Sequence, residues 1–448
     1  MRDIILGRVK ESADFDFAVR GKAISFGRKL SNYLKCAFVI LDKEHGSCRL
    51  VKKEEKAVYT LDFTDFRGKS IEEDLYHRDF TINTLALELG KFLDRKSSFA
   101  EIMDFYRGKR DIKERVIKAV NENSFIEDPL RILRAFSFSA ALGFSIEEKT
   151  LRLAKQSREK LISVSGERLR DELFKVFSTQ ESYRYLLSLD EIKVLDIIFP
   201  EIKKMRRIGQ GPYHHLDVWQ HTLESIRQLE GVFSELKNRQ ILNYLNEVIS
   251  SERTRRSLLK FGALLHDVGK PATLRHKDGR TTFHGHERVG LKIAQDVARR
   301  IKLSNDEIFS LHKMVLWHLR PGYLADSKNP TARAKFRYFR DAGREALSIL
   351  LLSLADQRST KGPLTTSKAR KAHERVVSNL ISEYLEKSKQ KKEERILNGH
   401  EIMKKFDLQP SPLVGKILKE IEELQAIGKV KNKEEAFKIA EKLIRSKR

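Results

Sequence analysis

The sequence is poor in cysteine and holds no long apolar run, and both deficits restrict what the chain can be. Only Cys36 and Cys48 occur among its 448 residues. That count excludes a disulfide framework and a cysteine-based zinc site. No apolar run approaches the roughly 20 residues that a membrane helix needs, and residues 1–8 are too short and too charged for a signal peptide. We therefore expect a cytoplasmic protein with no membrane partner.

Acidic residues are scarce relative to basic ones. Lys and Arg number 88 against 63 Asp and Glu, which gives a net charge of +25. Such a surplus attracts polyanions, and nucleic acid is the first candidate. A charged surface that serves solubility or heat resistance is the alternative. The hydrophobic content of 40% is that of a globular protein.

Strand and helix patterns change along the chain and predict an α+β N-terminal part followed by helices alone. Alternating or continuous apolar residues predict strands at 14–19, 36–42, from 49 onward and 58–63, and helical spacing predicts helices over 23–34 and 72–87. Asp128 before Pro129 predicts a helix that starts there and stops at Gly143. We expect four parts, with boundaries at 1–110, 111–208, 209–365 and 366–448.

Asp14 and Asp16 stand two apart in the first predicted strand. Residues two apart in a strand share a face, and two neighbouring carboxylates repel unless a cation lies between them. Magnesium suits oxygen ligands that are shared with substrate phosphates. A solvated strand end carries an Asp-x-Asp pattern more often than a metal site does, so other motifs have to support the metal.

Four stretches of the chain occur in the order of one known family. They are residues 2–8 with Asp14-Phe15-Asp16, Arg78-Asp79-Phe80-Thr81-Ile82-Asn83, residues 127–136 and residues 167–173. Together they resemble the class II tRNA nucleotidyltransferases and the related bacterial poly(A) polymerases. The resemblance spans the chain and implies a nucleotidyltransferase head, a helical neck, a body and a tail that holds tRNA.

The resemblance implies nucleotidyl transfer to an RNA 3′-hydroxyl, with release of pyrophosphate. Asp14 and Asp16 match the catalytic carboxylates that hold Mg²⁺, and two metal ions can lower the charge on the attacking and leaving oxygens. Asp62, in the strand at 58–63, is our candidate for a third carboxylate. An ordinary strand-end aspartate is the alternative for Asp62.

The nucleotide site is expected from the same resemblance. It assigns nucleotide binding to Arg2, Arg78, Asp79, Asn83, Asp128, Arg131 and Arg134. Asp128 and Arg131 lie three apart on the predicted helix, so they should hold each other and read the base of CTP or ATP by its amine and ring acceptor. Arg134 would meet the triphosphate or support that pair. A plain intrahelical salt bridge is the alternative.

Two departures from the family pattern stand out. The family carries a Gly-Gly pair just before the position of Arg2, and this chain begins at Met1 without it. We expect a truncated start, with an impaired phosphate grip as the alternative. Members also often carry an arginine where this chain has Ser137, which predicts a weaker contact there.

A second constellation resembles the HD metal-dependent phosphohydrolases. It consists of His221, the His266-Asp267 pair and Asp356, with His286 and His318 as ligands of a second ion. Imidazole and carboxylate together suit a transition metal. The resemblance leaves open whether this domain hydrolyses phosphate esters or serves as a helical body.

The leading expectation is a template-independent enzyme that uses CTP and ATP to add the full 3′-terminal CCA of tRNA, or its terminal A. Poly(A) polymerase is the alternative within the class. An HD phosphohydrolase with a degenerate, RNA-binding head is the alternative from another class. Basic clusters near 203–207, 253–256 and 299–300 are expected to contact RNA phosphates, with an ordinary solvated face as the alternative for each. The sequence does not determine the oligomeric state.

Overall fold

The computed structural model describes residues 1–8, 14–55, 57–93, 101–277, 279–327, 329–389 and 394–445. The chain forms two compact units. Unit 1 comprises residues 1–176 and 188–198, and unit 2 comprises residues 177–187 and 199–448. The expected α+β head followed by helices is confirmed. Within the described ranges, no helix is long and apolar enough to cross a membrane.

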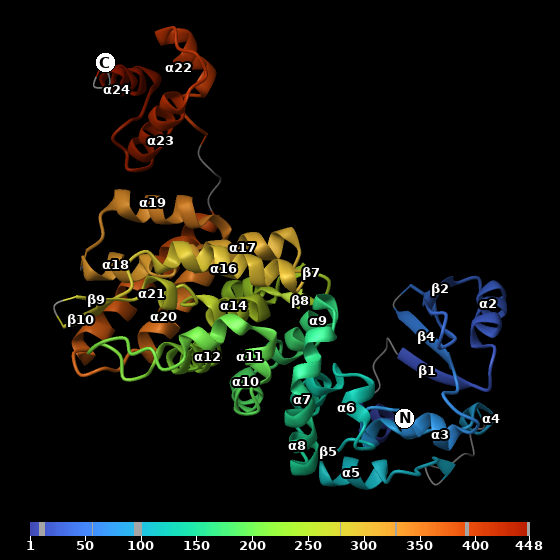
Figure 1. Ribbon diagram of the computed structural model, residues 1–448. Coiled ribbons are helices and arrows are strands. Elements are labelled where there is room, and N and C mark those ends of the chain that lie inside the picture. Colours follow the sequence, from blue (N-terminus) through green and yellow to red (C-terminus); the bar gives the residue numbers. More distant parts are fainter. Residues whose placement is uncertain are drawn as a thin grey trace. The chain divides into compact units, whose positions relative to one another are not determined.

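Unit 1 is built on a four-stranded mixed sheet in the order β1-β4-β3-β2 (Figure 1). The strands are β1 (Asp14–Val19), β2 (Ala37–Asp42), β3 (Ser47–Lys53) and β4 (Val58–Asp65). β1 runs parallel to β4, and the β2–β3 and β3–β4 pairs are antiparallel. All four strands were predicted from alternating or continuous apolar residues.

Helix α2 (Ala23–Leu34) covers one face of this sheet. Its core contains Ala23, Cys48, Leu50 and Phe63, and the Phe17 ring stacks on Phe63 at 4.8 Å. Because side chains alternate along a strand, the odd-numbered positions of β1 face this core. The even-numbered positions therefore belong to the opposite face.

The remaining helices of unit 1 are short. They are α1 (Arg2–Ile5), α3 (Ile71–Tyr76), α4 (Leu89–Leu93), α5 (Gly108–Glu114), α6 (Ser124–Glu127), α7 (Arg131–Leu142), α8 (Glu148–Ser157), α9 (Gly166–Phe177) and α11 (Val194–Ile198). β5 (Val116–Ile117) pairs with β6 (Ser145–Ile146). α10 (Ser182–Glu191) is divided between the two units.

Two helix predictions in unit 1 are wrong at their ends. The helix expected over 72–87 ends at Tyr76, and Phe80 is already extended at φ −130°. The helix expected from Asp128 begins only at Arg131. Asp128 itself is extended at φ −144°, as a residue before proline prefers. The expected stop is confirmed, because Gly143 caps α7 with φ +71°.

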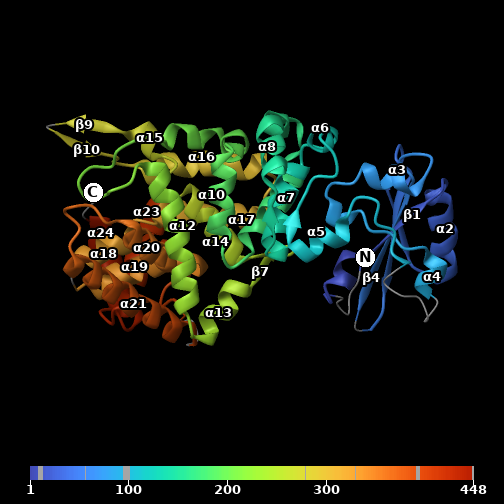
Figure 2. The same cartoon turned by 90° about the horizontal axis from the view of Figure 1, so that it is seen from below.

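Unit 2 is almost entirely helical (Figure 2). Its body contains α12 (Val218–Glu235), α13 (Arg239–Asn246), α14 (Arg255–Leu265), α15 (Lys270–Thr273), α16 (His286–Arg300), α17 (Asn305–Trp317), α18 (Arg320–Asp326), α19 (Ala332–Ala342), α20 (Ala346–Ser359) and α21 (Ser367–Lys389). Short strands form β7 (Val248–Ser250) with β8 (Arg253–Thr254), and β9 (Arg275–Lys277) with β10 (Arg280–Thr282).

The C-terminal helices α22 (Gly399–Phe406), α23 (Pro412–Ala426) and α24 (Lys433–Arg445) enclose a small core of their own. One buried carboxylate ties this group to α19. Glu423 of α23 accepts hydrogen bonds from Arg333 at 2.8 Å, Arg337 at 2.8 Å and Arg340 at 2.6 Å. The three cations lie along one face of α19, since they are spaced by about one helical turn.

Candidate functional sites

The first candidate site begins at the register of β1 with β4. Asp16 lies directly opposite Asp62, and directly opposite side chains of neighbouring strands lie on the same face. Asp16 is exposed. Asp62 lies opposite Arg49 on its other side and forms a bidentate ion pair with it, with both distances at 2.7 Å. The backbone of Asp14 pairs with Thr60, while its side chain lies outside the described part of the structure.

This face carries the oxygen ligands that Mg²⁺ prefers. Asp16 offers an exposed carboxylate, and Asp62 stands beside it with its charge already matched by Arg49. Because Arg49 compensates its charge, Asp62 is better placed to orient the site than to supply an unpaired negative charge to a metal ion. The register brings it to the position expected for a third carboxylate, and its partner Arg49 was not foreseen.

A buried carboxylate organises the arginines expected at the nucleotide. Asp79 is 7% exposed and accepts hydrogen bonds from Asn83 Nδ2 at 2.9 Å and Arg134 Nε at 2.9 Å. Arg2 Nη1 in turn donates to Asn83 Oδ1 at 2.7 Å. Burial would raise the pKa of Asp79, but Arg134 and Asn83 outweigh it and hold that pKa below its usual value. Four residues expected at the nucleotide thus form one connected network.

Phe138 completes this network, and the sequence reasoning did not find it. The guanidinium carbons of Arg2 and Arg134 lie 4.9 Å and 5.1 Å from the centre of its ring. Cation–π attraction of this kind contributes about 0.5–1 kcal/mol at exposed sites. Phe138 stands four residues after Arg134 on α7, and that helical spacing was available in the sequence.

Arg78 belongs to a separate ion pair. Its Nη2 donates to Asp74 Oδ2 at 2.9 Å, and Asp74 is fully buried. Asp74 Oδ1 also accepts the backbone N–H of Arg67 at 3.1 Å. A third of the Arg78 side chain remains exposed. Asp74 therefore fixes the Arg78 guanidinium at the surface, and among the described residues Arg78 takes no part in the hydrogen-bond network around Asp79.

Asp128 and Arg131 do not hold each other. Asp128 Oδ2 accepts a hydrogen bond from Arg168 Nη2 at 2.8 Å, and its Oδ1 accepts the N–H of Leu130 at 3.1 Å. Arg131 is buried and donates to the carbonyls of His77 at 2.6 Å and Ser124 at 3.1 Å. The expected pairing is wrong because Asp128 precedes α7 in an extended conformation, so the two side chains are not on one helix face.

Ser137, where the family pattern often has arginine, has a defined role in this chain. Its hydroxyl donates to the buried Glu172 on α9. Glu172 also accepts from Lys175 at 2.8 Å and lies 3.8 Å from Arg134. The serine thus connects α7 to the motif at 167–173 by a hydrogen bond to a carboxylate.

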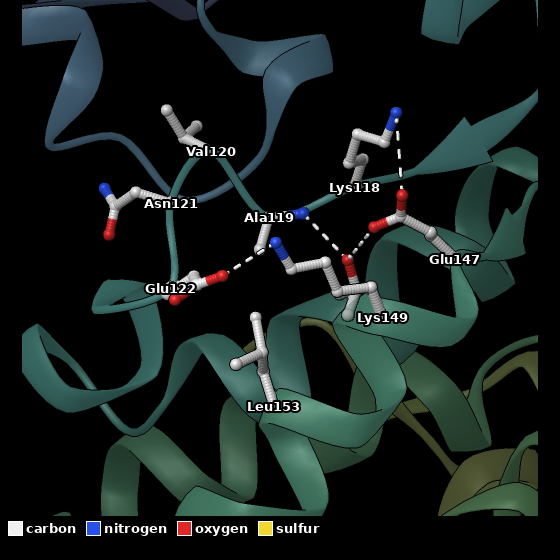
Figure 3. A pocket seen from close by; sticks show the side chains of 9 residues that line it. Lys118, Ala119, Val120, Asn121, Glu122, Glu147, Lys149 and Leu153 are labelled. Carbon is white, nitrogen blue, oxygen red and sulfur yellow. Dashed lines mark hydrogen bonds and ion pairs between the residues drawn. The ribbon is translucent and has the colours of Figure 1, made fainter.

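A cavity of about 230 Å³ in unit 1 contains none of the expected site residues. Figure 3 shows that its charged side chains pair with one another. Lys118 lies 3.6 Å from Glu147, and Lys149 lies 2.7 Å from Glu122. Charges that are already matched leave little to recognise a nucleotide, so this cavity is not our candidate site.

The second candidate site lies in unit 2, where six side chains converge from five helices. His221 belongs to α12, His266 and Asp267 follow α14, His286 opens α16, His318 follows α17, and Asp356 belongs to α20. They form two groups that could each hold a metal ion: His221, His266 and Asp356, and Asp267, His286 and His318. All six residues had been expected as ligands from their order in the sequence.

The histidine rings are oriented for metal binding. The Nδ1 atoms of His266, His286 and His318 hydrogen-bond to the backbone carbonyls of Ala263, Phe283 and Val315 at 2.8, 2.9 and 2.7 Å. Such anchoring fixes the tautomer and leaves Nε2 as the ligand. The fully buried Nε2 of His266 has no hydrogen-bond partner among the described residues. A buried nitrogen without a partner is costly, and a metal ion would satisfy it.

Asp267 connects the two groups. Its Oδ2 lies 3.3 Å from His266 Nε2, and its Oδ1 lies 3.3 Å from His286 Nε2. One carboxylate therefore faces both groups and would be available to hold a metal ion there. Nitrogen and oxygen ligands favour a transition metal over magnesium, and the transition metal expected from the sequence stays a prediction.

Close packing behind Asp267 depends on glycine. A side chain at Gly269 would collide with the backbone of His286 and Gly290. Glycine at this position lets the turn that carries His266 and Asp267 approach α16, which carries His286.

Two residues beside this centre were not foreseen. Lys270 Nζ donates to Asp267 Oδ2 and to Gln210 Oε1, both at 2.6 Å. The His214 ring meets the His221 ring edge-on at 4.8 Å. Burial, His221 and Lys270 lower the pKa of His214 to about 3. Lys270 stands three residues after Asp267, and this short spacing was a signal in the sequence that could have identified it. His214 lies far from the other residues of the centre in the sequence, and only the fold of its loop brings it to His221.

One of the expected RNA-binding clusters is structural. Arg253 forms a buried ion pair with Glu307 at 2.6 Å, and Arg255 is buried against Glu345 and Glu247. The prediction that these two arginines contact RNA is wrong, since buried and paired guanidinium groups are not available to phosphates. Lys203 and Lys204 remain exposed.

Family models match most of the chain. The poly A polymerase head domain matches residues 1–118, a model of the RNA-binding site of polymerase A matches 143–205, the HD domain matches 218–361, and a tRNA nucleotidyltransferase domain matches 292–440.

Curated relatives cover nearly the full chain. The A-adding tRNA nucleotidyltransferase of Deinococcus radiodurans is 31% identical over 433 residues, covering 95% of this chain and 90% of that protein. The CC-adding tRNA nucleotidyltransferase of Thermus thermophilus is 28% identical and covers 97% and 90%.

Solved structures share the fold. A CCA-adding enzyme in complex with ATP has a TM-score of 0.64 at 23% identity, covering 100% of this chain and 89% of its own. The Thermotoga maritima CCA-adding enzyme complexed with tRNA has a TM-score of 0.61 at 23% identity, with the same coverage.

Proposed function

The chain belongs to the family of tRNA nucleotidyltransferases and related poly(A) polymerases, and from this premise we propose that it adds nucleotides of the 3′-terminal CCA to tRNA, as the full triplet or the terminal A. The substrates are CTP and ATP, and pyrophosphate is released. The observation that carries this proposal is the register that sets Asp16 opposite Asp62 on the exposed face of the head sheet. The A-adding relative with its broad coverage supports it.

Asp14 and Asp16 would hold Mg²⁺, with Asp62 and its partner Arg49 beside them. Bound metal would lower the negative charge on the attacking and leaving oxygens. Arg2 and Arg134, held by Asn83, Asp79 and the Phe138 ring, would face the triphosphate as fixed cations. Fixed charges of this kind favour the transition state because they need no reorganisation.

Base selection would centre on Asp128. Its carboxylate can accept from the exocyclic amine that cytosine carries at C4 and adenine at C6, where uracil and guanine carry a carbonyl. Arg168 holds the carboxylate by its Oδ2. Arg131 would support the loop beneath it through its bonds to the carbonyls of His77 and Ser124, and could donate to a ring acceptor only after those bonds open.

Three tRNA acceptors test the proposal: one that ends before CCA, one that ends after C and one that ends after CC. Each is incubated with CTP, ATP or both. We expect growth to stop at CCA and to require a tRNA-shaped acceptor. Unlimited extension of unrelated RNA with ATP alone would instead support a poly(A) polymerase. If no nucleotide were incorporated into any of the three acceptors, the proposal would be refuted.

A second activity is favoured by the unpartnered, buried Nε2 of His266. We propose that the unit 2 centre binds a transition metal and hydrolyses phosphate esters at RNA ends. Metal content measured by mass spectrometry, together with release of phosphate from a 3′-phosphorylated or 2′,3′-cyclic RNA end, tests it. Hydrolysis without any nucleotide incorporation would favour the HD phosphohydrolase with a degenerate head.

A further inference from the structure

His221 differs from the other three histidines of the unit 2 centre in its place on its helix. His266 and His318 directly follow α14 and α17, and His286 is the first residue of α16. At each of these helix ends, the backbone carbonyl three residues earlier anchors the Nδ1 atom of the ring. His221 instead lies inside α12, at the end of its first turn.

The helix itself offers His221 no comparable anchor. In an α-helix the carbonyls are used by the N–H groups four residues later, and the carbonyl of Asp217 accepts the N–H of His221 at 2.9 Å. The carbonyl of Val218, three residues before His221, also accepts the hydroxyl of Thr222 at 2.8 Å. An anchor for Nδ1 of His221 therefore has to come from another element.

Ser359 of α20 supplies that anchor. Its Oγ lies 3.1 Å from Nδ1 of His221, although the two residues are 138 positions apart. Ser359 is 1% exposed and His221 is 0% exposed, so the contact is shielded from solvent. The contact results from the packing of α12 against α20. Ser359 also stands three residues after Asp356, which belongs to the same possible metal-binding group as His221.

The partners of the Ser359 hydroxyl decide which atom donates in this contact. A hydroxyl has one proton to donate and two lone pairs that accept. Its Oγ lies 2.6 Å from the backbone carbonyl of Asp356, which can only accept, so the hydroxyl proton is directed there. Ser225 Oγ lies 3.0 Å from Ser359 Oγ and gives its own proton to the carbonyl of His221 at 2.9 Å. Ser359 therefore accepts from His221, whose proton lies on Nδ1.

A proton on Nδ1 leaves the Nε2 lone pair of His221 available to a metal ion. This Nε2 lies 2.9 Å from Oδ1 of Asp356. A lone pair and a carboxylate at that distance repel each other unless a proton or a metal cation stands between them. All four histidines of the centre thus turn Nε2 inward, three of them through backbone carbonyls and His221 through a side-chain hydroxyl.

We propose that Ser359 is a positioning residue of the unit 2 centre, which keeps the His221 proton on Nδ1 and so keeps Nε2 available to the metal ion. Without this hydroxyl, His221 can carry its proton on Nε2 and donate it to Asp356. Metal binding then has to move the proton to a buried Nδ1 that lacks an acceptor, and a buried unsatisfied donor is costly. The inference rests on the metal binding proposed for this centre and concerns metal affinity, not turnover.

Zinc binding to the full chain, measured by competition with a chromophoric chelator, tests the proposal. Only zinc that the parent retains and His266→Ala loses is counted. Ser359→Ala should weaken the affinity about tenfold, the lower end of the roughly 10–100-fold loss that follows removal of an outer hydrogen-bond partner from a metal ligand. Ser359→Thr keeps the hydroxyl and should bind like the parent. Ser359→Cys keeps only a weak acceptor and should fall between the two.

Two matched controls separate this role from a purely structural one. Thr360 donates to the same Asp356 carbonyl at 3.0 Å, and in the described part of the chain no hydrogen bond joins it to His221, so Thr360→Val should keep the zinc affinity. Ser225→Ala removes a buried hydroxyl of the same network but leaves the acceptor for Nδ1. Its melting temperature in EDTA should fall as far as that of Ser359→Ala, while its zinc affinity stays that of the parent. Equal losses of zinc affinity in the two alanine variants would overturn the proposal.

The position of the proton is read directly by ¹⁵N NMR of the zinc-loaded chain with labelled histidine. His221 should carry its proton on Nδ1 in the parent, and that proton signal should move upfield in Ser359→Ala, where it has lost its acceptor. A proton on Nε2 in the zinc-loaded parent would overturn the proposal. A parent that binds no zinc refutes the metal site itself, and the inference with it. Zinc binding of equal strength in the parent and Ser359→Ala refutes the inference alone.

Discussion

Asp128 accepts its hydrogen bond from Arg168, which lies 40 positions further along the chain, and not from Arg131. The Asp128–Arg168 pair is partly exposed, with 27% and 53% of the two side chains accessible. The Asp128 carboxylate, which we propose reads the base, is therefore oriented by Arg168 of α9. Arg131, the arginine nearer in sequence, instead donates to the backbone carbonyls of His77 and Ser124.

Arg168→Ala should loosen base selection without unfolding the protein. Because Asp128 would lose one of its two hydrogen bonds, we expect the preference for CTP and ATP over UTP and GTP to fall about fivefold, as befits a charged hydrogen bond weakened by exposure. The ratio of kcat/KM values for the four nucleotides measures it. Arg168→Lys should restore part of the preference, and an unchanged ratio would contradict the role.

Arg131→Ala should destabilise unit 1. The carbonyls of His77 and Ser124 would lose the buried Arg131 guanidinium as a donor, and so would the partly exposed carboxylate of Glu127. Unsatisfied buried groups cost roughly 1–3 kcal/mol each, so we expect a loss of about 3 kcal/mol in the free energy of unfolding. Urea titration followed by circular dichroism measures it. Arg168→Ala is the surface control. Equal losses in the free energy of unfolding in the two variants would contradict the claim that burial makes Arg131 the more important of the two arginines for stability.

Asp79→Asn should destabilise unit 1 at neutral pH but not in acid. The pKa of Asp79 is depressed in the folded protein, so its stabilising contribution is present above the unfolded value of about 3.9 and is lost as pH falls through the folded value. We expect the parent and the variant to differ by about 2 kcal/mol at pH 7.

The difference in unfolding free energy should narrow below pH 4, and urea titrations at pH 7, 5 and 3 would reveal the trend. Asp3→Asn is the control, since the carboxylate of Asp3 pairs with Arg2 but is half exposed. A parent–variant difference that stays constant from pH 7 to pH 3 would mean that Asp79 is not ionised in the folded protein.

Asp16→Asn and His266→Ala should separate the two proposed activities. Asp16→Asn removes a metal-binding carboxylate from the head, so nucleotide addition should fall at least ~10³-fold while bound transition metal is retained. His266→Ala should lose the bound metal and phosphate release, yet keep nucleotide addition. Nucleotide incorporation and metal content are measured on the same preparations. Loss of both activities in either variant would show that the two sites depend on each other.

Glu423→Gln should release the C-terminal helices from α19. The carboxylate is 6% exposed and neutralises three arginines. We expect about 2 kcal/mol of lost stability, less than for a fully buried pair because the arginines are partly exposed. Faster hydrogen exchange of the α23 amides reports it. Glu434→Gln, an exposed position at the start of α24, should leave exchange unchanged.

The sequence alone determined the features that repeat at short range or stand in a fixed order. The HD ligand set was expected from a family resemblance, and its roles stay predictions. The strand at 14–19 was predicted from its alternation, and the end of α7 was predicted from Gly143. These patterns are local, because periodicities of two and 3.6 residues and cap residues act through neighbouring positions.

Only the tertiary structure decided which partners meet. The pairing of Asp128 with Arg168, the burial of Arg131 and the stacking of Phe138 on two arginines depend on how distant segments pack. A single local feature, the extended conformation of Asp128 before proline, overturned the expected Asp128–Arg131 pair. The register of β1 with β4 brought Asp62 opposite Asp16, and register is set by whole-sheet packing against α2 rather than by the residues that it brings together.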